Sequence, residues 1–194
     1  MQPNMKYAGF WKRFGAGWID GFVLLVPSVF LMWLHSVSKT WAFLTELPLA
    51  FLFYAYEIYF HGRWGQTIGK RSVDIKVVSL DGSSITWRQA FLRSSVGLGL
   101  GVLYSISTFV ALVNMTDADF SALSWTELAI KEAELSPYIN AITIAMYVWM
   151  ASEVVVLLFN RKKRALHDYI AGTVVVETAP ATMETTSSAG TGAI

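Results

Sequence analysis

The residues best placed to do chemistry are an arginine and a carboxylate at the start of a long apolar run. In the segment GFWKRFGAGWIDGFVLLVPSVFLMWL (residues 9–34), Arg13 lies at the start of the apolar run and Asp20 lies within it. A carboxylate within hydrocarbon costs about 2.5–3.5 kcal/mol on insertion scales, so Asp20 must face protein or water. On a helix the two side chains share a face about 10 Å apart along the axis, and Arg13 leans away from Asp20. We therefore expect Asp20 to take its counter-charge from another segment, most readily Lys70, Arg71 or Arg164, and Arg13 to meet Asp168 or a nearby carbonyl.

Two further acids lie inside apolar runs, at a depth similar to that of Asp20. At about 1.5 Å per residue, Asp20, Glu57 and Glu153 all fall about 5–10 Å from the same membrane boundary. The basic residues near this layer are Arg13, Lys70, Arg71, Arg164 and His167. The layer is therefore a candidate cluster with two interpretations.

The first interpretation is a cation or proton site, because unpaired carboxylates within a membrane mark ion pathways. The second is an ionic clamp, in which the acids attach the segments GQTIGKR (65–71) and RALHD (164–168) to the helices. The balance of charges discriminates between them. A cluster with as many Arg and Lys side chains as acids has little negative charge left for a cation.

The composition is that of an integral membrane protein. Of 194 residues, 54% are hydrophobic and only 15% charged, whereas about a quarter of a soluble domain is charged. Cysteine is absent, which excludes disulfides and thiolate chemistry. The three histidines form no pair at metal-ligand spacing, so we expect no metal, no cofactor and no enzymatic activity, and nothing indicates binding to nucleic acid.

The apolar runs predict an all-α protein with four transmembrane helices, because each is about as long as a bilayer crossing. The expected spans are about 14–34, 41–60, 94–113 and 137–159, in a membrane domain covering 1–177. Thirteen of the fifteen Lys and Arg residues lie before the first span, between the second and third, or after the fourth. The positive-inside rule then predicts an inner-membrane protein with both termini and the insert 61–93 in the cytoplasm, and an acidic outer loop at 114–136.

The cytoplasmic insert is predicted to hold a small β-hairpin. Apolar and polar residues alternate over 73–77, and Asp81-Gly82 is a turn signal before Ile85 and Trp87. Thr86 and Gln89 have the spacing of a capping box, which predicts a helix start there. Short helices are expected at 125–135 and 165–170, an added strand at 173–176, and a disordered low-complexity tail at 178–194.

Two pairs of glycines predict close helix approach. Gly17 and Gly21 are four apart in the first span, and Gly97 and Gly101 in the third. Small residues at this spacing let another helix come near. We expect these two faces to meet each other, or to meet a second copy or another membrane protein.

Four blocks of sequence resemble the RDD family of membrane proteins, which is named for one Arg and two Asp. They are Arg13 with Asp20, GQTIGKR followed by VDIKVV (73–78), RQAFLR (88–93), and RALHDYIAGT (164–173). The resemblance maps Arg13 and Asp20 onto the first two letters, with Asp168 as the best match to the third. For function it implies cation/proton antiport, which is associated with some members. The alternative is a non-catalytic assembly or scaffold partner of another membrane protein.

Overall fold

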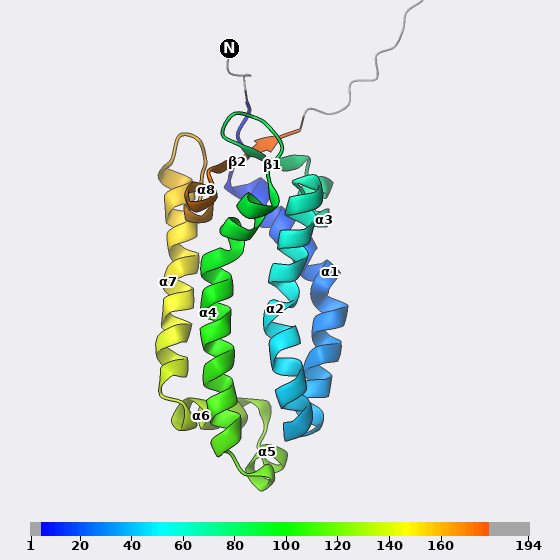
Figure 1. Cartoon of the computed structure of the whole chain (residues 1–194), viewed down its shortest axis with the longest axis vertical. Coiled ribbons are helices and arrows are strands. Elements are labelled where there is room, and N and C mark those ends of the chain that lie inside the picture. Colours follow the sequence, from blue (N-terminus) through cyan, green and yellow to red (C-terminus); the bar gives the residue numbers. More distant parts are fainter. Residues whose placement is uncertain (1–4, 179–194) are drawn as a thin grey trace, which may run out of the picture.

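The computed structural model describes residues 5–178, and the predicted tail lies outside them except for Thr178. Four long helices run side by side, α1 (Phe10–Val37), α2 (Lys39–Trp64), α4 (Trp87–Asn114) and α7 (Tyr138–Phe159). They contain the four predicted spans, apart from residue 137 at the start of α7. Shorter elements cover both ends of this bundle (Figure 1). They are α3 (Ile68–Ser72), β1 (Ile75–Ser79), α5 (Asp117–Ala122), α6 (Trp125–Leu135), α8 (Leu166–Ala171) and β2 (Thr173–Glu177).

Local signals in the sequence set several helix boundaries. The capping box is confirmed, because the Thr86 side chain accepts from the Gln89 backbone and Gln89 bonds back to the Thr86 backbone. Gly65 ends α2 with φ at 71°, and Gly172 ends α8 with φ at 65°. Both angles lie in the left-handed region that glycine adopts without a steric penalty.

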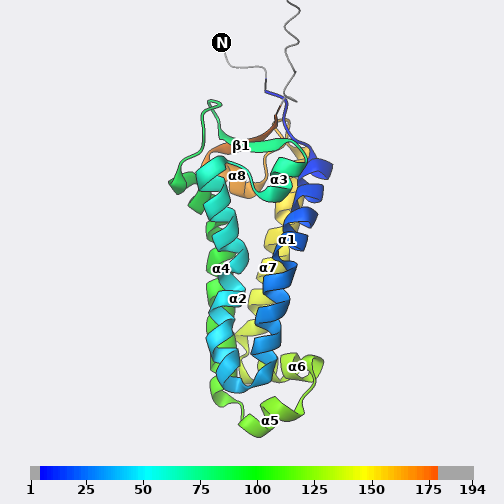
Figure 2. The same cartoon turned by 90° about the vertical axis from the view of Figure 1, so that its right-hand side faces the viewer.

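Three of the helices, α1, α4 and α7, are long and apolar enough to cross a membrane. The chain is therefore a helical membrane protein. The fourth long helix, α2, has 26 residues and carries Glu46 and Glu57. It lies between α1 and α4 along the length of the bundle (Figure 2). Its own crossing stays a prediction.

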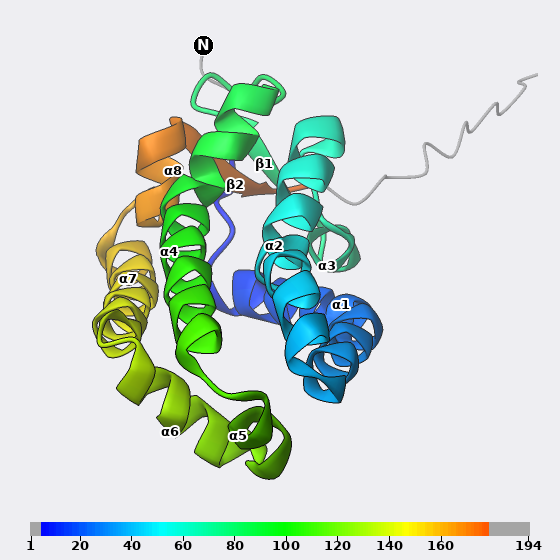
Figure 3. The same cartoon turned by 60° about the horizontal axis from the view of Figure 1, so that its bottom comes forward.

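The four long helices form an open arc in the order α1, α2, α4, α7 (Figure 3). The two helices at the ends of the arc keep most of their surface uncovered. In the most apolar stretches of α1 and α7 only 6% of residues are buried, against 33% in α4. Two long apolar faces are thus left for lipid or for another protein.

The predicted hairpin is wrong, because β1 pairs with a strand almost a hundred residues later in the chain. The sheet has two antiparallel strands, β1 and β2, with Ile75 opposite Glu177 and Ser79 opposite Thr173. After β1 the chain does turn at Asp81 and makes one bridge, from Val78 to Ser84. The cap at Thr86 then starts α4, so no residues remain for a local partner strand. The C-terminal strand expected at 173–176 takes that place.

The elements at the far end of the bundle fold onto it through apolar contacts. Helix α6 spans the residues predicted for a short outer helix, whereas α5 was not predicted. A buried cluster joins them to α2 and α4, and consists of Ala42, Leu112, Met115, Phe120 and Leu128. The loop 114–136 is therefore an ordered cover on this end.

The two glycine faces do not meet, which corrects that expectation. A Cβ at Gly97 would lie 2.8 Å from the hydroxyl of Tyr54, so the glycines of α4 make room for a tyrosine of α2. A Cβ at Gly17 or Gly21 would meet nothing within 4 Å. The reason is that α1 packs against α2 and α3 through other residues and leaves these glycines uncovered.

Candidate functional site

The polar cluster at the sheet end of the bundle is centred on Asp168 in α8. Its carboxylate is completely buried and accepts from Arg13 Nη1 at 2.7 Å and from Arg93 Nη1. The backbone amide of Ala165 also donates to it, at 3.0 Å. Burial alone would raise the pKa of Asp168, but the positive charges of Arg93 and Arg13 hold it well below its ordinary range. Asp168 is thus a charged junction between α1, α4 and α8.

Arg13 contacts Asp168 as predicted, and it ties the end of α1 to two loops as well. Its guanidinium donates to the carbonyl of Ala8 at 3.3 Å and to that of Lys163. Arg93 was missed as a member of the cluster, although it stood in the RQAFLR block. The sequence signal for Arg93 was its position, because it is the seventh residue of α4 and no charged residue follows it in that helix.

Asp20 has no ionic partner within residues 5–178, so the expected pairing with Lys70, Arg71 or Arg164 is wrong. It is 3% exposed and accepts from Tyr56 Oη at 2.6 Å, Thr67 Oγ1 at 2.6 Å and the Gly69 amide at 2.7 Å. The start of α3 rests directly on α1 and supplies two of these donors. Three neutral donors therefore hold the Asp20 carboxylate, and no basic side chain of the described residues pairs with it.

Glu57 and Lys70 form a second part of the cluster, with Lys70 Nζ 3.7 Å from the Glu57 carboxylate. Burial lowers the pKa of Lys70, and the charge of Glu57 opposes that fall. This pair lies on the same cavity wall as Asp20. Lys70 therefore meets an acid of the predicted layer, but a different one from Asp20.

Glu153 and His167 form the third part. His167 Nδ1 lies 2.5 Å from Glu153, and the His167 amide donates to the same carboxylate at 3.0 Å. The other ring nitrogen, Nε2, lies 3.0 Å from Arg93 Nη2. Arginine can only donate, so Nε2 is an acceptor and the His167 ring is neutral in this arrangement.

Two predicted members of the cluster lie outside it. Arg71 is exposed on α3. Arg164 donates to the carbonyls of Asp168 and Thr173 at 2.8 and 3.0 Å, and its guanidinium stacks 3.9 Å from the centre of the Tyr169 ring. Neither one neutralises a buried acid.

No sequence pattern selects His61, which lies beside the cluster in α2. It is 1% exposed, and within the described chain neither ring nitrogen has a hydrogen-bond partner.

A cavity of about 200 Å³ opens between these groups. Its polar walls bring together residues from α1, α2, α3, α4 and α8, namely Arg13, Asp20, Glu57, Lys70, Arg93 and His167. Since a water molecule occupies about 30 Å³ in the liquid, the space suits several waters or a partly hydrated cation. No group of three or more His, Asp or Glu in residues 5–178 has the arrangement of a metal site.

The cluster has four carboxylates, Asp20, Glu57, Glu153 and Asp168, and three basic side chains, Arg13, Lys70 and Arg93. With His167 neutral, one negative charge is uncompensated. One proton on His167, or one cation in the cavity, would restore the balance.

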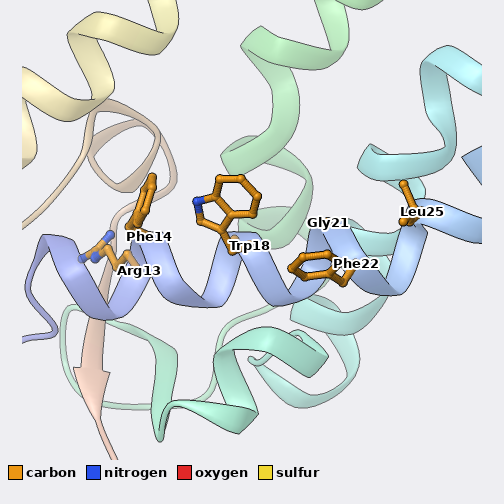
Figure 4. A pocket seen from close by; sticks show the side chains of 7 residues that line it. Arg13, Phe14, Trp18, Gly21, Phe22 and Leu25 are labelled. Atoms are coloured by element: carbon orange, nitrogen blue, oxygen red, sulfur yellow. The ribbon is translucent and has the colours of Figure 1, made fainter.

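The glycine face of α1 carries an apolar hollow of about 460 Å³ (Figure 4), which shares Arg13 and Gly17 with the cavity of the ionic cluster. Phe14, Trp18 and Phe22 line it beside Gly17 and Gly21. The glycine face left open by the fold is therefore a groove edged by aromatic rings.

The fold and the site define a class of polytopic helical membrane protein whose helices enclose an ionic cluster beneath a small polar cap. The chain belongs to the RDD family, whose model matches residues 7–172. It is also similar to the uncharacterized protein YckC of Bacillus subtilis (strain 168), with 27% identity over 176 residues, which are 90% of this chain and 87% of that protein. No solved structure matches it.

Proposed function

We propose that this RDD-family protein is a transporter that couples the movement of a monovalent cation to that of a proton. The observation that carries the proposal is the single uncompensated negative charge beside a cavity between the helices. A charge held in such a place attracts a cation strongly, because few water molecules screen it. The proposal assigns no catalytic step to the chain.

His167 supplies the coupling. Its Nε2 accepts from Arg93, so a proton can bind there only if that hydrogen bond breaks. A protonated His167 would cancel the negative charge that otherwise holds the cation. Proton and cation therefore compete for one charge, which is the elementary requirement for exchange.

The proposed topology has four crossings, with α2 as the fourth, in the inner membrane. The sheet and both termini lie in the cytoplasm, and α5 and α6 lie outside. The charge distribution supports this orientation, since only Lys39 and Lys131 among the fifteen Lys and Arg residues fall at the α5–α6 end.

Flux measurements on reconstituted protein test the proposal. Vesicles with a trapped pH indicator should report a pH change when sodium or potassium is added outside. Asp20→Asn should abolish it, because Asn keeps an oxygen for Tyr56 and Gly69 but carries no charge. Asp81→Asn is the matched control, since Asp81 is exposed in the loop after β1.

Size-exclusion chromatography and circular dichroism establish that each variant is folded. A folded wild-type sample without flux for any alkali cation would overturn the transport proposal. So would unchanged flux in folded Asp20→Asn.

A second candidate function is that of a non-catalytic assembly partner, with the cluster as a structural clamp. The observation in its favour is the uncovered groove at Gly17 and Gly21. Because the chain has no cysteine, Gly21→Cys places a single thiol in that groove. Self-cross-linking in the membrane would support contact between copies there.

A further inference from the structure

A second cavity lies at the opposite end of the bundle from the ionic cluster. Its volume is about 380 Å³, within the range of small-molecule sites. Helix α6 lies across this end of the bundle (Figure 2). Side chains from α1, α2, α4 and α6 line the cavity, so it depends on the packing of the outer cover against three long helices.

Two carboxylates enter this cavity without a cationic partner. Glu46 of α2 is 6% exposed and Glu132 of α6 is partly buried. Within residues 5–178 no Lys or Arg comes within ion-pair distance of either. Lys131, next in sequence, instead pairs with Glu134 at 3.3 Å.

Burial, with the charge of Glu46 as second cause, raises the pKa of Glu132 to about 7. The other titratable groups in the cavity wall are His35 of α1 and Tyr104 of α4. Helix α7 also packs against α6 but contributes no lining residue.

A buried hydroxyl in the same wall also lacks a partner. Thr108 is 2% exposed, lines the cavity, and its Oγ1 has no hydrogen-bond partner among the described residues. An unsatisfied buried hydroxyl is destabilising, and a bound polar group would offset that cost. This observation is independent of the two acids.

His35 adds an acceptor. The Thr45 hydroxyl donates to the carbonyl of Trp41 at 2.7 Å, so its oxygen accepts from His35 Nδ1, 3.3 Å away. The remaining nitrogen of the neutral ring, Nε2, is then unprotonated. Positive charge is thus absent from the wall, and acceptors dominate its polar part.

The rest of the wall is aromatic and apolar. Trp125 stacks on His35 with the ring centres 6.2 Å apart, and Tyr104, Leu49 and Leu128 complete the surface. Aromatic faces attract organic cations, whereas an alkali or divalent ion prefers a full shell of oxygens. The combination suits a ligand with positive charge and an apolar surface.

We propose that this outer cavity binds an organic ammonium group, with Glu46 and Glu132 facing the charge and Trp125 and Tyr104 covering its methyl or methylene groups. The group can belong to a free amine or to a lipid headgroup. This binding site is separate from the cavity proposed for transport. It is tested by an equilibrium binding measurement, whose result does not depend on whether the protein transports ions.

Calorimetric titration of the purified protein with tetramethylammonium chloride tests binding. We expect a saturable isotherm that weakens at least about tenfold in Glu46→Gln and in Glu132→Gln. Glu134→Gln, an exposed acid two positions along the same helix, should bind as the wild type does. Binding should strengthen from about pH 6 to about pH 8 as Glu132 loses its proton, and Glu132→Gln should remove that dependence.

Two further arms identify the source and the class of ligand. If the site takes a lipid headgroup, tetramethylammonium should bind more weakly in nanodiscs that contain phosphatidylethanolamine than in nanodiscs of phosphatidylglycerol alone, because the lipid competes for the site. Equal affinities for tetramethylammonium in the two kinds of nanodisc indicate a free amine. Sodium chloride at equal concentration should not compete. Absence of saturable binding, equal competition by sodium, or unchanged affinity in folded Glu46→Gln would overturn the proposal.

Discussion

At the scale of single residues, two buried aspartates of the cluster are stabilised in opposite ways. Asp168 is held by two arginines, whereas Asp20 is held by neutral donors. The charge of Asp168 is therefore fully neutralised by the two arginines. The second arrangement leaves a carboxylate that other positive species can still approach, which is why the transport proposal relies on Asp20 and not on Asp168.

Asp168→Asn should lower the melting temperature strongly at neutral pH. The change leaves Arg13 and Arg93 buried without a counter-charge, and breaking such a pair costs about 3–5 kcal/mol. Because the folded-state pKa of Asp168 is depressed, its stabilisation is present above the unfolded value of about 3.9 and is lost as the pH falls below it. The gap between wild type and variant should therefore be constant from about pH 6 to about pH 8. Thermal unfolding in detergent measures it, with Asp81→Asn as control, and equal melting temperatures would contradict this role.

At the scale of elements, the cap depends on one close approach between α3 and α1. A Cβ at Gly69 would lie 2.0 Å from the carbonyl oxygen of Ala16 and 2.8 Å from Asp20 Cγ. The backbone of α3 can therefore donate to Asp20 only because residue 69 has no side chain. From α3 the chain continues into β1, so the same contact positions the sheet.

Gly69→Ala should separate α3 from α1 and lower stability, since the backbone of Ala16 cannot give way. The melting temperature and hydrogen exchange of the Gly69 region provide the measurement, and exchange at this amide should accelerate. Gly99→Ala is the matched control, because a Cβ there meets nothing within 4 Å. In the interior of α4 it should be neutral or stabilising by up to about 1 kcal/mol. Equal effects of the two changes would argue against the close approach.

At the scale of the whole molecule, the open arc places its two polar cavities at opposite ends. One lies beneath the sheet and the other beneath α6, and each has carboxylates from more than one helix. The two cavities can be reached from opposite sides of the membrane only if the sheet end and the α6 end of the bundle lie on opposite sides.

Single cysteines at Ser83 and Ser121 test that topology, because both residues are exposed and the chain has no cysteine of its own. In inside-out vesicles and in intact cells, an impermeant maleimide should label the two positions from opposite sides. Ser83 should react only from the cytoplasmic side. Labelling of both from one side would rule out four crossings.

The sequence alone accounts for the long helices, because an apolar run of about 20 residues has few alternatives in a bilayer. It also determined local boundaries such as the cap at Thr86, and the meeting of Arg13 with Asp168. These features depend on neighbours in the chain or on a charge that must be neutralised. The RDD resemblance fixed the family from the same blocks.

The partners of the buried groups, in contrast, depend on tertiary packing. The neutral donors to Asp20 come from residues 36 to 49 positions away, and Gly69 shows no sign of its role in sequence. The strand β1 pairs with β2 because α4 begins so soon after β1 that no nearby residues are left to form a strand. Strand propensity does not reveal this pairing. The outer cavity likewise combines four helices, and no local pattern specifies such a meeting, because long-range packing depends on how all the helix faces fit together.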